Sequence, residues 1–226
     1  MSAGEDLSWE VELPDRRTLG LGYGARPRAT LTVVTEDRGE ERISLPVSVG
    51  RVLKSKTDAH ELNPGSRAEL LYELREMSGR CAALRVEKLV DKRDYSAQEL
   101  SNKLALDGFS ASIREAAVSR AQDCGLVNDN RYAATFIRSK LSSGWGVSRI
   151  ERELRLRGIE LREVPGWPEE FVEEGDEDER AYAVASTRRI AEKNGFEKLV
   201  RFLCGRGFSM GCAVRAARRV MDEAGV

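Results

Sequence analysis

Apolar residues follow a helical spacing along most of the chain, and they repeat in one frame. Two apolar residues four positions apart are followed, after three further residues, by a glycine and another apolar residue. Each copy is typical of a helix that ends at a glycine, after which the apolar residue anchors the chain as the next helix begins. The three copies are Leu100, Leu104, Gly108 and Phe109; Ile150, Leu154, Gly158 and Ile159; Leu199, Leu203, Gly207 and Phe208.

The regular interval between the copies predicts helical units arranged in tandem, each of which covers the apolar face of its neighbour. We expect repeat 1 over residues 93–145, with the stretch that begins at Asn128 as its third helix. Repeat 2 is expected over 146–194, and a two-helix repeat 3 over 195–226. The expected fold class is mainly α, with a small β-hairpin before the repeats.

The hairpin is indicated by alternation of apolar and polar residues on both sides of the turn-like sequence "EDRGEE". Leu31 and Val33 precede this turn, and Ile43 and Leu45 follow it. A connecting helix comes next, with Ser66 as its expected N-cap. We therefore assign 28–92 to a β-hairpin plus a connecting helix. Residues 1–27 are rich in glycine, proline and charge, and we expect them to be poorly ordered.

Repeat 2 departs from the frame after its glycine. The sequence "ELREVPGWPEEFVEEGDEDE" places Pro165 and Pro168 where the interior of a middle helix is expected. We expect that helix to be broken, with a restart that has Pro168 as its first helical residue. Residues 163–177 hold seven acidic side chains and no basic one, so 163–179 is expected to be an exposed acidic insertion.

Composition narrows the functional classes. The net charge of −1 and the pI of about 6.1 argue against a protein that grips nucleic acid with its whole surface. His60 is the only histidine, which removes the commonest general base. The glycine-rich stretch 20–24 lacks the rest of a phosphate-binding loop. We expect no enzyme, cofactor or metal site.

The four cysteines have no CxxC spacing, so four free and mostly buried thiols are expected at Cys81, Cys124, Cys204 and Cys212. The acidic N-terminus does not resemble a signal peptide, and no stretch is apolar enough for a membrane span. These features predict a cytoplasmic protein without a membrane partner, and we expect a monomer.

Three successive segments resemble the RecX family of regulatory proteins. They are "RDYSAQELSNKLALDGFS" at 93–110, "GLVNDNRYAATFIRSKLSSGWG" at 125–146 and "GVSRIERELRLRGI" at 146–159. The resemblance implies an elongated, curved stack of three-helix repeats that lodges in the groove of the RecA–DNA filament. It also implies inhibition of recombination, ATP hydrolysis and coprotease activity, and thus modulation of DNA repair, without an active site of the chain's own. The implied partners are the RecA filament and the single-stranded DNA within it.

Basic side chains opposite the apolar stripes are the candidate contacts. In the helix of 146–159, Glu151 with Arg155 and Glu153 with Arg157 are favourable i,i+4 pairs, which leaves Arg149 and Arg152 without such an explanation. Leu156 lies on the same face, where exposure is expected. The candidate residues for binding the RecA filament or its DNA are Arg138, Lys140, Trp145, Arg149, Arg152, Leu156, Arg188, Arg189, Arg215, Arg218 and Arg219.

Other interpretations of these residues remain open. The basic faces could simply be solvated, Leu156 could pack against the adjacent repeat, and Trp145 could belong to a core. At the level of function, the alternatives are a module that binds DNA directly and a helical-repeat adaptor for another protein. A direct DNA-binding module predicts tight duplex binding with a steep dependence on salt.

Overall fold

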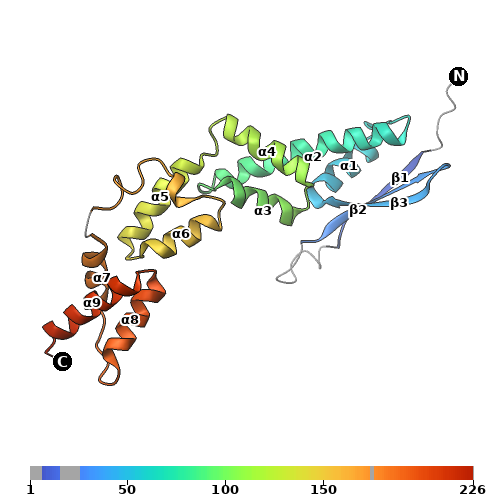
Figure 1. Ribbon diagram of the computed structural model, residues 1–226. Coiled ribbons are helices and arrows are strands. Elements are labelled where there is room, and N and C mark those ends of the chain that lie inside the picture. The colour runs from blue at the N-terminus through green and yellow to red at the C-terminus, as the bar shows by residue number, and fades with distance from the viewer. Residues whose placement is uncertain (1–6, 16–25, 174–175, 226) are drawn as a thin grey trace. The chain divides into compact units, whose positions relative to one another are not determined.

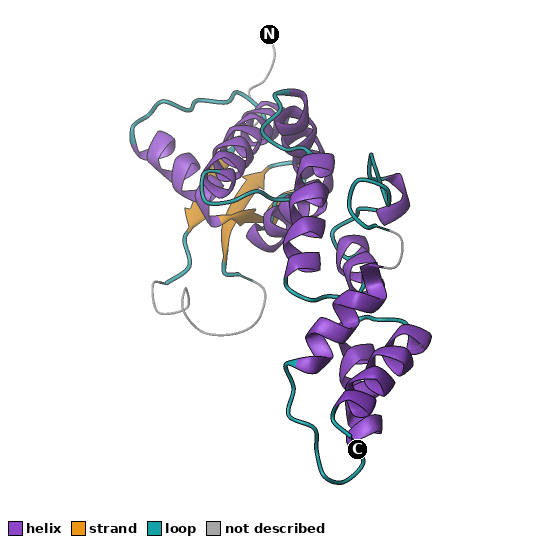
Figure 2. Ribbon diagram, turned by 90° about the vertical axis from the view of Figure 1, so that its left-hand side faces the viewer, coloured by secondary structure: helices purple, strands orange, loops and turns teal. Residues whose placement is uncertain are grey.

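The computed structural model describes residues 7–15, 26–173 and 176–225 of the 226-residue chain. They form two compact units that divide between Val127 and Asn128 (Figure 1). Helices predominate in both units, and within the described residues strands occur only in the N-terminal one (Figure 2). The expectation of a mainly α chain with a small N-terminal sheet is confirmed.

A three-stranded antiparallel sheet in the order β1–β2–β3 opens the N-terminal unit. Strands β2 (Arg28–Thr35) and β3 (Gly39–Pro46) form the predicted hairpin. Alternation along β2 buries Leu31 and Val33, as the sequence pattern predicts. The apolar face of the hairpin thus becomes one wall of the N-terminal core.

The N-terminal segment differs from the expectation of poor order over 1–27. Ser8–Glu12 forms strand β1, which pairs with β2 so that Val11 lies opposite Leu31. Val11 is buried, and the indole of Trp9 donates a hydrogen bond to Thr57 Oγ1 at 3.2 Å. Apolar and acidic residues alternate here as in a strand with one solvated face, a signal that the neighbouring glycines and charges obscure. Residues 1–6 and 16–25 lie outside the described residues.

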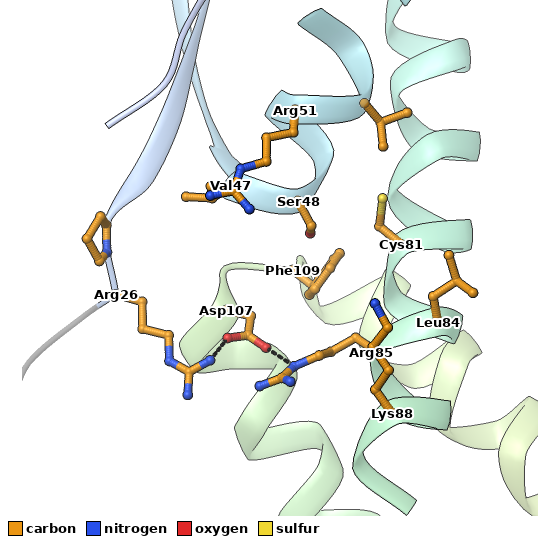
Figure 3. Close-up of a pocket in the computed structure, with 12 residues that line it drawn as sticks. Arg26, Val47, Ser48, Arg51, Cys81, Leu84, Arg85, Lys88, Asp107 and Phe109 are labelled. Atoms are coloured by element: carbon orange, nitrogen blue, oxygen red, sulfur yellow. Dashed lines mark hydrogen bonds and ion pairs between the residues drawn. The ribbon is translucent and has the colours of Figure 1, made fainter. Parts of the chain in front are cut away.

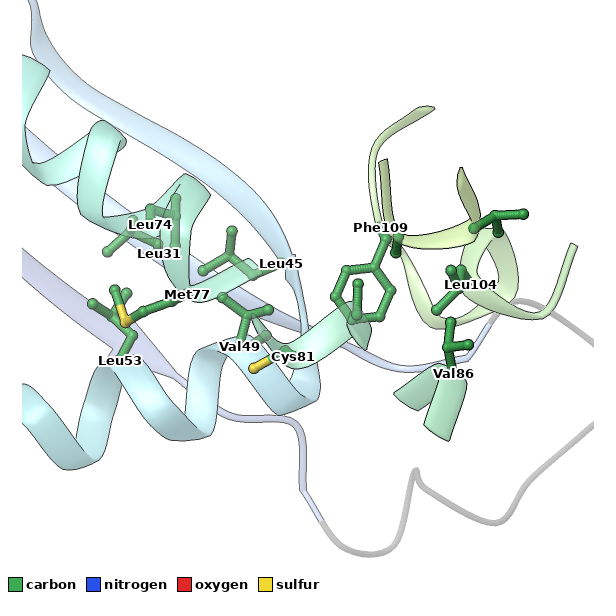
Figure 4. Close-up of a cluster of buried hydrophobic side chains, with 14 of the residues drawn as sticks. Leu31, Leu45, Val49, Leu53, Leu74, Met77, Cys81, Val86, Leu104 and Phe109 are labelled. Carbon is green, nitrogen blue, oxygen red and sulfur yellow. The ribbon is translucent and has the colours of Figure 1, made fainter. Parts of the chain in front are cut away.

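Helices α1 (Val47–Asp58) and α2 (Arg67–Val90) share the hydrophobic core of this unit with the sheet and with the helices that follow (Figure 4). The sequence pattern did not predict α1. Gly50 allows this helix to approach the sheet closely, since a Cβ at Gly50 would lie only 2.4 Å from that of Ala29. Ser66 caps α2 as predicted, accepting a hydrogen bond from the Glu69 backbone N–H at 3.3 Å. Helices α3 (Ala97–Asp107) and α4 (Ala111–Asp123) follow.

The C-terminal unit begins with α5 (Asp129–Ser142) and α6 (Val147–Arg155), followed by a short 3₁₀ helix, η2 (Leu161–Glu163). Helices α7 (Asp176–Ser186), α8 (Gly195–Arg206) and α9 (Met210–Glu223) complete it. These elements enclose two hydrophobic clusters, one around α5 and α6 and one among α7, α8 and α9.

Helix α5 groups differently from the sequence-based assignment to repeat 1. Its buried residues Ala133 and Ile137 share a cluster with Ile150 and Leu154 of α6. The division between the compact units accordingly precedes α5. A linking helix is equally near both neighbours in sequence, so only its packing shows to which of them it belongs.

The repeated glycine frame has the predicted structure in all three copies. Gly108, Gly158 and Gly207 are left-handed, with φ of +98°, +75° and +94°. In each copy, the backbone N–H of the apolar residue after the glycine donates a hydrogen bond to the backbone carbonyl of the second apolar residue of the frame. The three N–O distances are 3.1, 3.1 and 3.2 Å. This bond is the mark of a helix that ends in a Schellman motif. The apolar residues of the three frames are all buried.

The acidic insertion is partly as predicted. After η2 the chain runs through turns, so the expected break in the middle helix is confirmed. The expected restart at Pro168 is wrong: the Val172 N–H bonds to the Pro168 carbonyl at 2.9 Å, but no helix is assigned between η2 and α7 within the described residues. The last four residues, 176–179, form the acidic first turn of α7, where negative charge is favourable.

Candidate functional site

The segment between α5 and α6 brings three of the predicted contact residues together. Trp145 is half-buried, and its ring meets that of Phe136 edge-on, with centroids 6.3 Å apart and planes at 86°. The Lys140 ammonium lies 5.0 Å from the Trp145 centroid, and the Arg149 guanidinium carbon lies 3.8 Å from it. We call Phe136, Lys140, Trp145 and Arg149 the Trp145 cluster. Both cations are held by the electron-rich face of the indole.

Backbone contacts with α8 fix the start of α6 beside this cluster. The N-cap residue, Gly146, has no side chain to satisfy the first N–H groups of the helix. Instead, the Gly146 N–H donates to the Arg206 carbonyl at 3.0 Å, and the Ser148 N–H donates to the Gly207 carbonyl at 3.2 Å. The free N–H groups at the start of α6 and the free carbonyl groups at the end of α8 therefore form hydrogen bonds with each other.

Two arginines that the sequence analysis did not single out also hold this joint. Arg206 donates to the Ser143 carbonyl at 3.1 Å, and Arg180 donates to the Trp145 carbonyl. Arg206 is 63 residues from its acceptor in the sequence and Arg180 is 35 residues from its own, so no local pattern could reveal either bond. They anchor the backbone that presents Trp145.

Arg149 is less accessible than the sequence suggests. Its side chain is only partly exposed, and its Nε is buried without a hydrogen-bond partner among the described residues. A Cβ at Gly207 would lie 2.3 Å from the Arg149 Cβ, which shows how closely α6 and the end of α8 approach. Arg149 therefore has a packing role at the joint as well as its cation–π contact.

Arg152 and Leu156 are exposed on α6, at helical spacing from Arg149. Leu156 has 68% of its surface exposed, which is high for an apolar side chain, so packing within the C-terminal unit does not explain it. Arg152 is exposed and makes no ion pair among the described residues. We call Arg149, Arg152 and Leu156 the α6 contact face.

Arg155 of α6 and Arg157, just beyond the end of the helix, are paired as predicted. Arg155 Nη2 lies 3.0 Å from Glu151 Oε1, and Arg157 Nη1 lies 2.8 Å from Glu153 Oε2. Burial lowers the pKa of Arg157, but hydrogen bonds with Glu153 and the Tyr132 hydroxyl outweigh burial and raise it above its usual value. These pairs stabilise the helix and leave Arg149 and Arg152 as the arginines of α6 that form no ion pair among the described residues.

Three further candidates contact aromatic rings or remain exposed. The Arg138 guanidinium carbon lies 4.8 Å from the Phe171 centroid, and Phe171 itself comes from the acidic insertion. Arg188, just after α7, lies 4.2 Å from the Phe202 centroid. Arg189 is exposed and has no ion-pair partner among the described residues. Neither Arg188 nor Arg189 contacts the Trp145 cluster within the part of the chain that the structure describes.

On α9, two of the three candidate arginines are paired within the chain. The Arg215 guanidinium donates two hydrogen bonds to the Asp178 carboxylate, of 3.0 and 2.7 Å. Arg219 lies 2.8 Å from Glu179 and 3.3 Å from Glu223. The sequence offers Asp222 and Glu223, near the chain end, as acids within helical reach, but the acidic first turn of α7 lies alongside α9 and supplies Asp178 and Glu179 as well. Arg218 is exposed without an ion pair among the described residues.

No group of three or more histidine, cysteine or carboxylate side chains could hold a metal ion within the described residues. The four cysteines are free thiols, but only Cys81 and Cys212 are buried, so the expectation of mostly buried thiols holds for half of them. Among the helices of the described residues, none is long and apolar enough to cross a membrane.

Comparison with known proteins places the region around α5 and α6 in a family. A model described as "RecX, second three-helix domain" matches residues 128–161, from the N-cap of α5 to the first residue of η2. The regulatory protein RecX of Halorhodospira halophila is 33% identical over 150 residues, which cover 64% of this chain and 88% of that protein. The chain belongs to the RecX family.

Other RecX proteins extend the match. A regulatory protein RecX of Thermus thermophilus is 33% identical over 137 residues, 60% of this chain and 89% of that protein. A crystal structure of a regulatory protein RecX has a TM-score of 0.55 at 16% identity and covers 96% of this chain and 99% of its own. RecX from Lactobacillus salivarius has a TM-score of 0.52 at 16% identity, over 63% and 96%. The relatives from Halorhodospira halophila and Thermus thermophilus are named as regulatory proteins.

Proposed function

We propose that this RecX-family chain is a negative regulator of the RecA recombinase and binds the RecA–DNA filament through the α6 contact face and the adjoining Trp145 cluster. The observation that carries the proposal is the combination of Arg152, which has no ion pair among the described residues, with an exposed leucine one helical turn later. The neighbouring arginines of the same helix are paired, so this face is where α6 can form new contacts.

The mixed character of the face favours a protein partner over naked DNA. An arginine can bind a carboxylate or a phosphate with two parallel hydrogen bonds. Leu156, in contrast, gains free energy only against an apolar surface, which a recombinase protomer offers and a phosphate backbone does not. Single-stranded DNA inside the filament is the second target, within reach of basic side chains outside α6.

Inhibition follows from occupancy, without chemistry by this chain. A chain of tandem helical units that contacts the filament at several points would span neighbouring protomers. Binding would then depend on the assembled filament and would oppose the changes between protomers that ATP hydrolysis requires. Strand exchange and coprotease activity would fall for the same reason, because both need free filament surface.

ATP hydrolysis by RecA on single-stranded DNA tests this proposal. We expect the wild-type chain to inhibit hydrolysis at stoichiometric or lower amounts. The Arg152→Ala/Leu156→Ser variant should reach the same inhibition only at a concentration about tenfold higher. It loses one charge contact with the filament and one leucine that the complex would bury. Absence of inhibition by the wild-type chain would overturn the proposal.

Arg155→Ala provides the matched control for the single variant Arg152→Ala. It removes the same charge from the same helix, but its side chain is paired with Glu151 instead of being free. We expect it to inhibit nearly as well as the wild-type chain. Equal losses for Arg152→Ala and Arg155→Ala would show that only total charge matters and that the α6 contact face is not a specific site.

A further inference from the structure

A cleft of about 660 Å³ lies in the N-terminal unit, between the start of β2, helix α1, helix α2 and the end of α3 (Figure 3). Its volume is within the usual range for ligand-binding clefts. None of its lining residues belongs to the Trp145 cluster or to the α6 contact face. It therefore offers a surface that the proposed filament contact leaves unused.

The charge of the cleft is strongly positive. Four basic side chains line it, from Arg26, Arg51, Arg85 and Lys88, against the single carboxylate of Asp107. Arg26 and Arg85 both form ion pairs with Asp107, the latter at 2.7 Å, as the dashed lines in Figure 3 show. Arg51 and Lys88 are exposed and form no ion pair among the described residues. They are the cations available to a ligand.

The cleft also has exposed apolar walls between these cations. Leu84 of α2 has 54% of its surface exposed, and Val52 of α1 has 37%. Cys81 lies deeper, and burial raises the pKa of its thiol, so it adds a neutral, weakly polar surface. A ligand that used only the charges would leave Leu84 and Val52 in contact with water.

These properties discriminate between classes of ligand. A single phosphate is far smaller than the cleft and has no apolar part. A nucleic acid would place phosphates on the cations, but its bases need an aromatic surface for stacking, and Phe109, the aromatic residue of the cleft, is only 5% exposed. An acidic peptide with one apolar side chain satisfies both the cations and the exposed leucine.

We propose that this cleft is a docking site for an acidic peptide segment of a partner protein, which inserts an apolar side chain between Val52 and Leu84 and pairs its carboxylates with Arg51 and Lys88. The Arg26–Asp107–Arg85 bridge is a structural part of the site, because it joins the start of β2 to α3 and α2 and so fixes the width of the cleft.

Fluorescence anisotropy with a labelled nine-residue peptide tests the site directly. The peptide has leucine at its centre and aspartate or glutamate elsewhere. Binding to the full chain is expected, with at least about tenfold weaker binding when serine replaces the leucine or when Arg51→Glu and Lys88→Glu are combined. Leu84→Ser should weaken binding of the leucine peptide but not of the serine peptide.

Lys54→Glu combined with Lys92→Glu is the matched control, since it makes the same charge change as the double variant at two exposed residues outside the cleft. It should bind the peptide nearly as tightly as the wild-type chain. All the substituted side chains are exposed, and an unchanged thermal midpoint would confirm that each variant is folded. Equal binding by the double variant and the wild-type chain would overturn the proposal.

A single-stranded oligonucleotide in the same assay separates the two classes of macromolecule. If the oligonucleotide binds weakly, and binds the double variant as it binds the wild-type chain, the result supports a peptide site. Oligonucleotide binding that is tighter than peptide binding and is lost in the double variant would overturn the proposal in favour of a nucleic-acid site. No RecA is present in these measurements, so their outcome is independent of the filament proposal.

Discussion

At the scale of single residues, Gly146 and Gly207 allow the start of α6 and the end of α8 to touch through their backbones. A Cβ at Gly146 would lie 2.1 Å from the Gly207 carbonyl carbon, and a Cβ at Gly207 would lie 2.6 Å from the Arg149 backbone nitrogen. The sequence predicts Gly207 as a helix stop from its place in the repeated frame. Gly207 also contacts the start of α6. This second role depends on Gly146, about 60 residues away, and no local sequence pattern indicates it.

Gly207→Ala should destabilise the C-terminal unit by about 2 kcal/mol or more, because alanine is strained at positive φ and its Cβ would collide with Arg149. Gly205→Ala is the control on the same helix: nothing lies near its added Cβ, and it should stabilise α8 by about 0.5–1 kcal/mol. Urea unfolding followed by circular dichroism measures both. Equal effects of the two substitutions would contradict the packed joint.

The cysteines should differ widely in reactivity. Burial, followed by a hydrogen bond to Asp178, raises the pKa of Cys212 to about 12, whereas Cys124 is exposed at the end of α4. Since the thiolate is the nucleophile, iodoacetamide at pH 8 should modify Cys124 first and Cys212 last. Mass spectrometry of the tryptic peptides would show the order. Modification of Cys212 as fast as Cys124 in the folded chain would contradict this environment.

The same shift predicts a loss of stability in alkali. A thiol with a raised pKa keeps its proton in the folded chain after the unfolded chain has lost it. The folded state therefore binds more protons between about pH 9 and pH 12, and the free energy of unfolding should fall as the pH rises through this window. Cys212→Ala should reduce that fall, which urea unfolding at pH 8 and pH 10 would measure.

At the scale of helices, the acidic first turn of α7 neutralises α9. The sequence predicts Asp178 and Glu179 as part of an exposed insertion and the α9 arginines as candidate contact residues. The structure joins the two through Arg215 and Arg219, across 37 and 40 residues. A helix wheel shows which face a side chain occupies but not which helix that face meets, so this pairing could not be predicted from the pattern alone.

Arg215→Ala should lower the free energy of unfolding slightly at neutral pH, because it removes the bidentate pair with Asp178. Hydrogen bonds from Arg215 and Cys212 depress the pKa of Asp178 below its ordinary 3.8, so this stabilisation is present above that value and is lost as the pH falls through the depressed one. Urea unfolding of the wild-type chain and the variant should therefore differ at pH 7, and the difference should shrink as the pH falls below 3.8. A difference that persists undiminished at low pH would contradict the ion pair.

The α6 helix was the most predictable part of the candidate site. Its core stripe, its two i,i+4 pairs and its exposed Arg152 and Leu156 all follow from spacing along one helix, and the structure agrees with each. Arg149 differs because its environment depends on α8, and Arg138 because Phe171 of the insertion lies over it. Local geometry was predictable, and contacts between distant helices were not.

At the scale of the whole molecule, the repeat predicted from three apolar frames accounts for most of the helical chain. The structure groups α5 with α6, which differs from the expected end of repeat 1, and the other boundaries of the repeats and the curvature of the array stay predictions. The repeated frame does not predict the N-terminal sheet. The hairpin follows from its own alternating pattern, but β1 was not predicted, because it lies in a stretch dominated by acidic residues. The cleft of the N-terminal unit was also unpredictable, because its lining residues are scattered from Arg26 to Phe109.

Binding to the filament should combine a salt-sensitive and a salt-insensitive part. As sodium chloride rises from about 50 to 300 mM, the dissociation constant should increase, because exposed charges are screened. The defect of Arg152→Ala should shrink over that range, whereas the defect of Leu156→Ser should not, since burial of a leucine does not depend on charge. Pelleting of RecA–DNA filaments with each variant measures this, and identical salt dependence of both defects would contradict the division.

Site-directed photocrosslinking tests the central claim most directly, namely that the α6 contact face touches the RecA filament. Leu156→Cys, in a chain with Cys124→Ser and Cys204→Ser to remove the two native thiols that are not buried, is labelled with a benzophenone maleimide and mixed with RecA on single-stranded DNA. Gly205→Cys, exposed on α8, is the matched control. We expect a crosslinked product with RecA from position 156 and little from position 205. Crosslinking that is absent from position 156, or equal at the two positions, would contradict the claim.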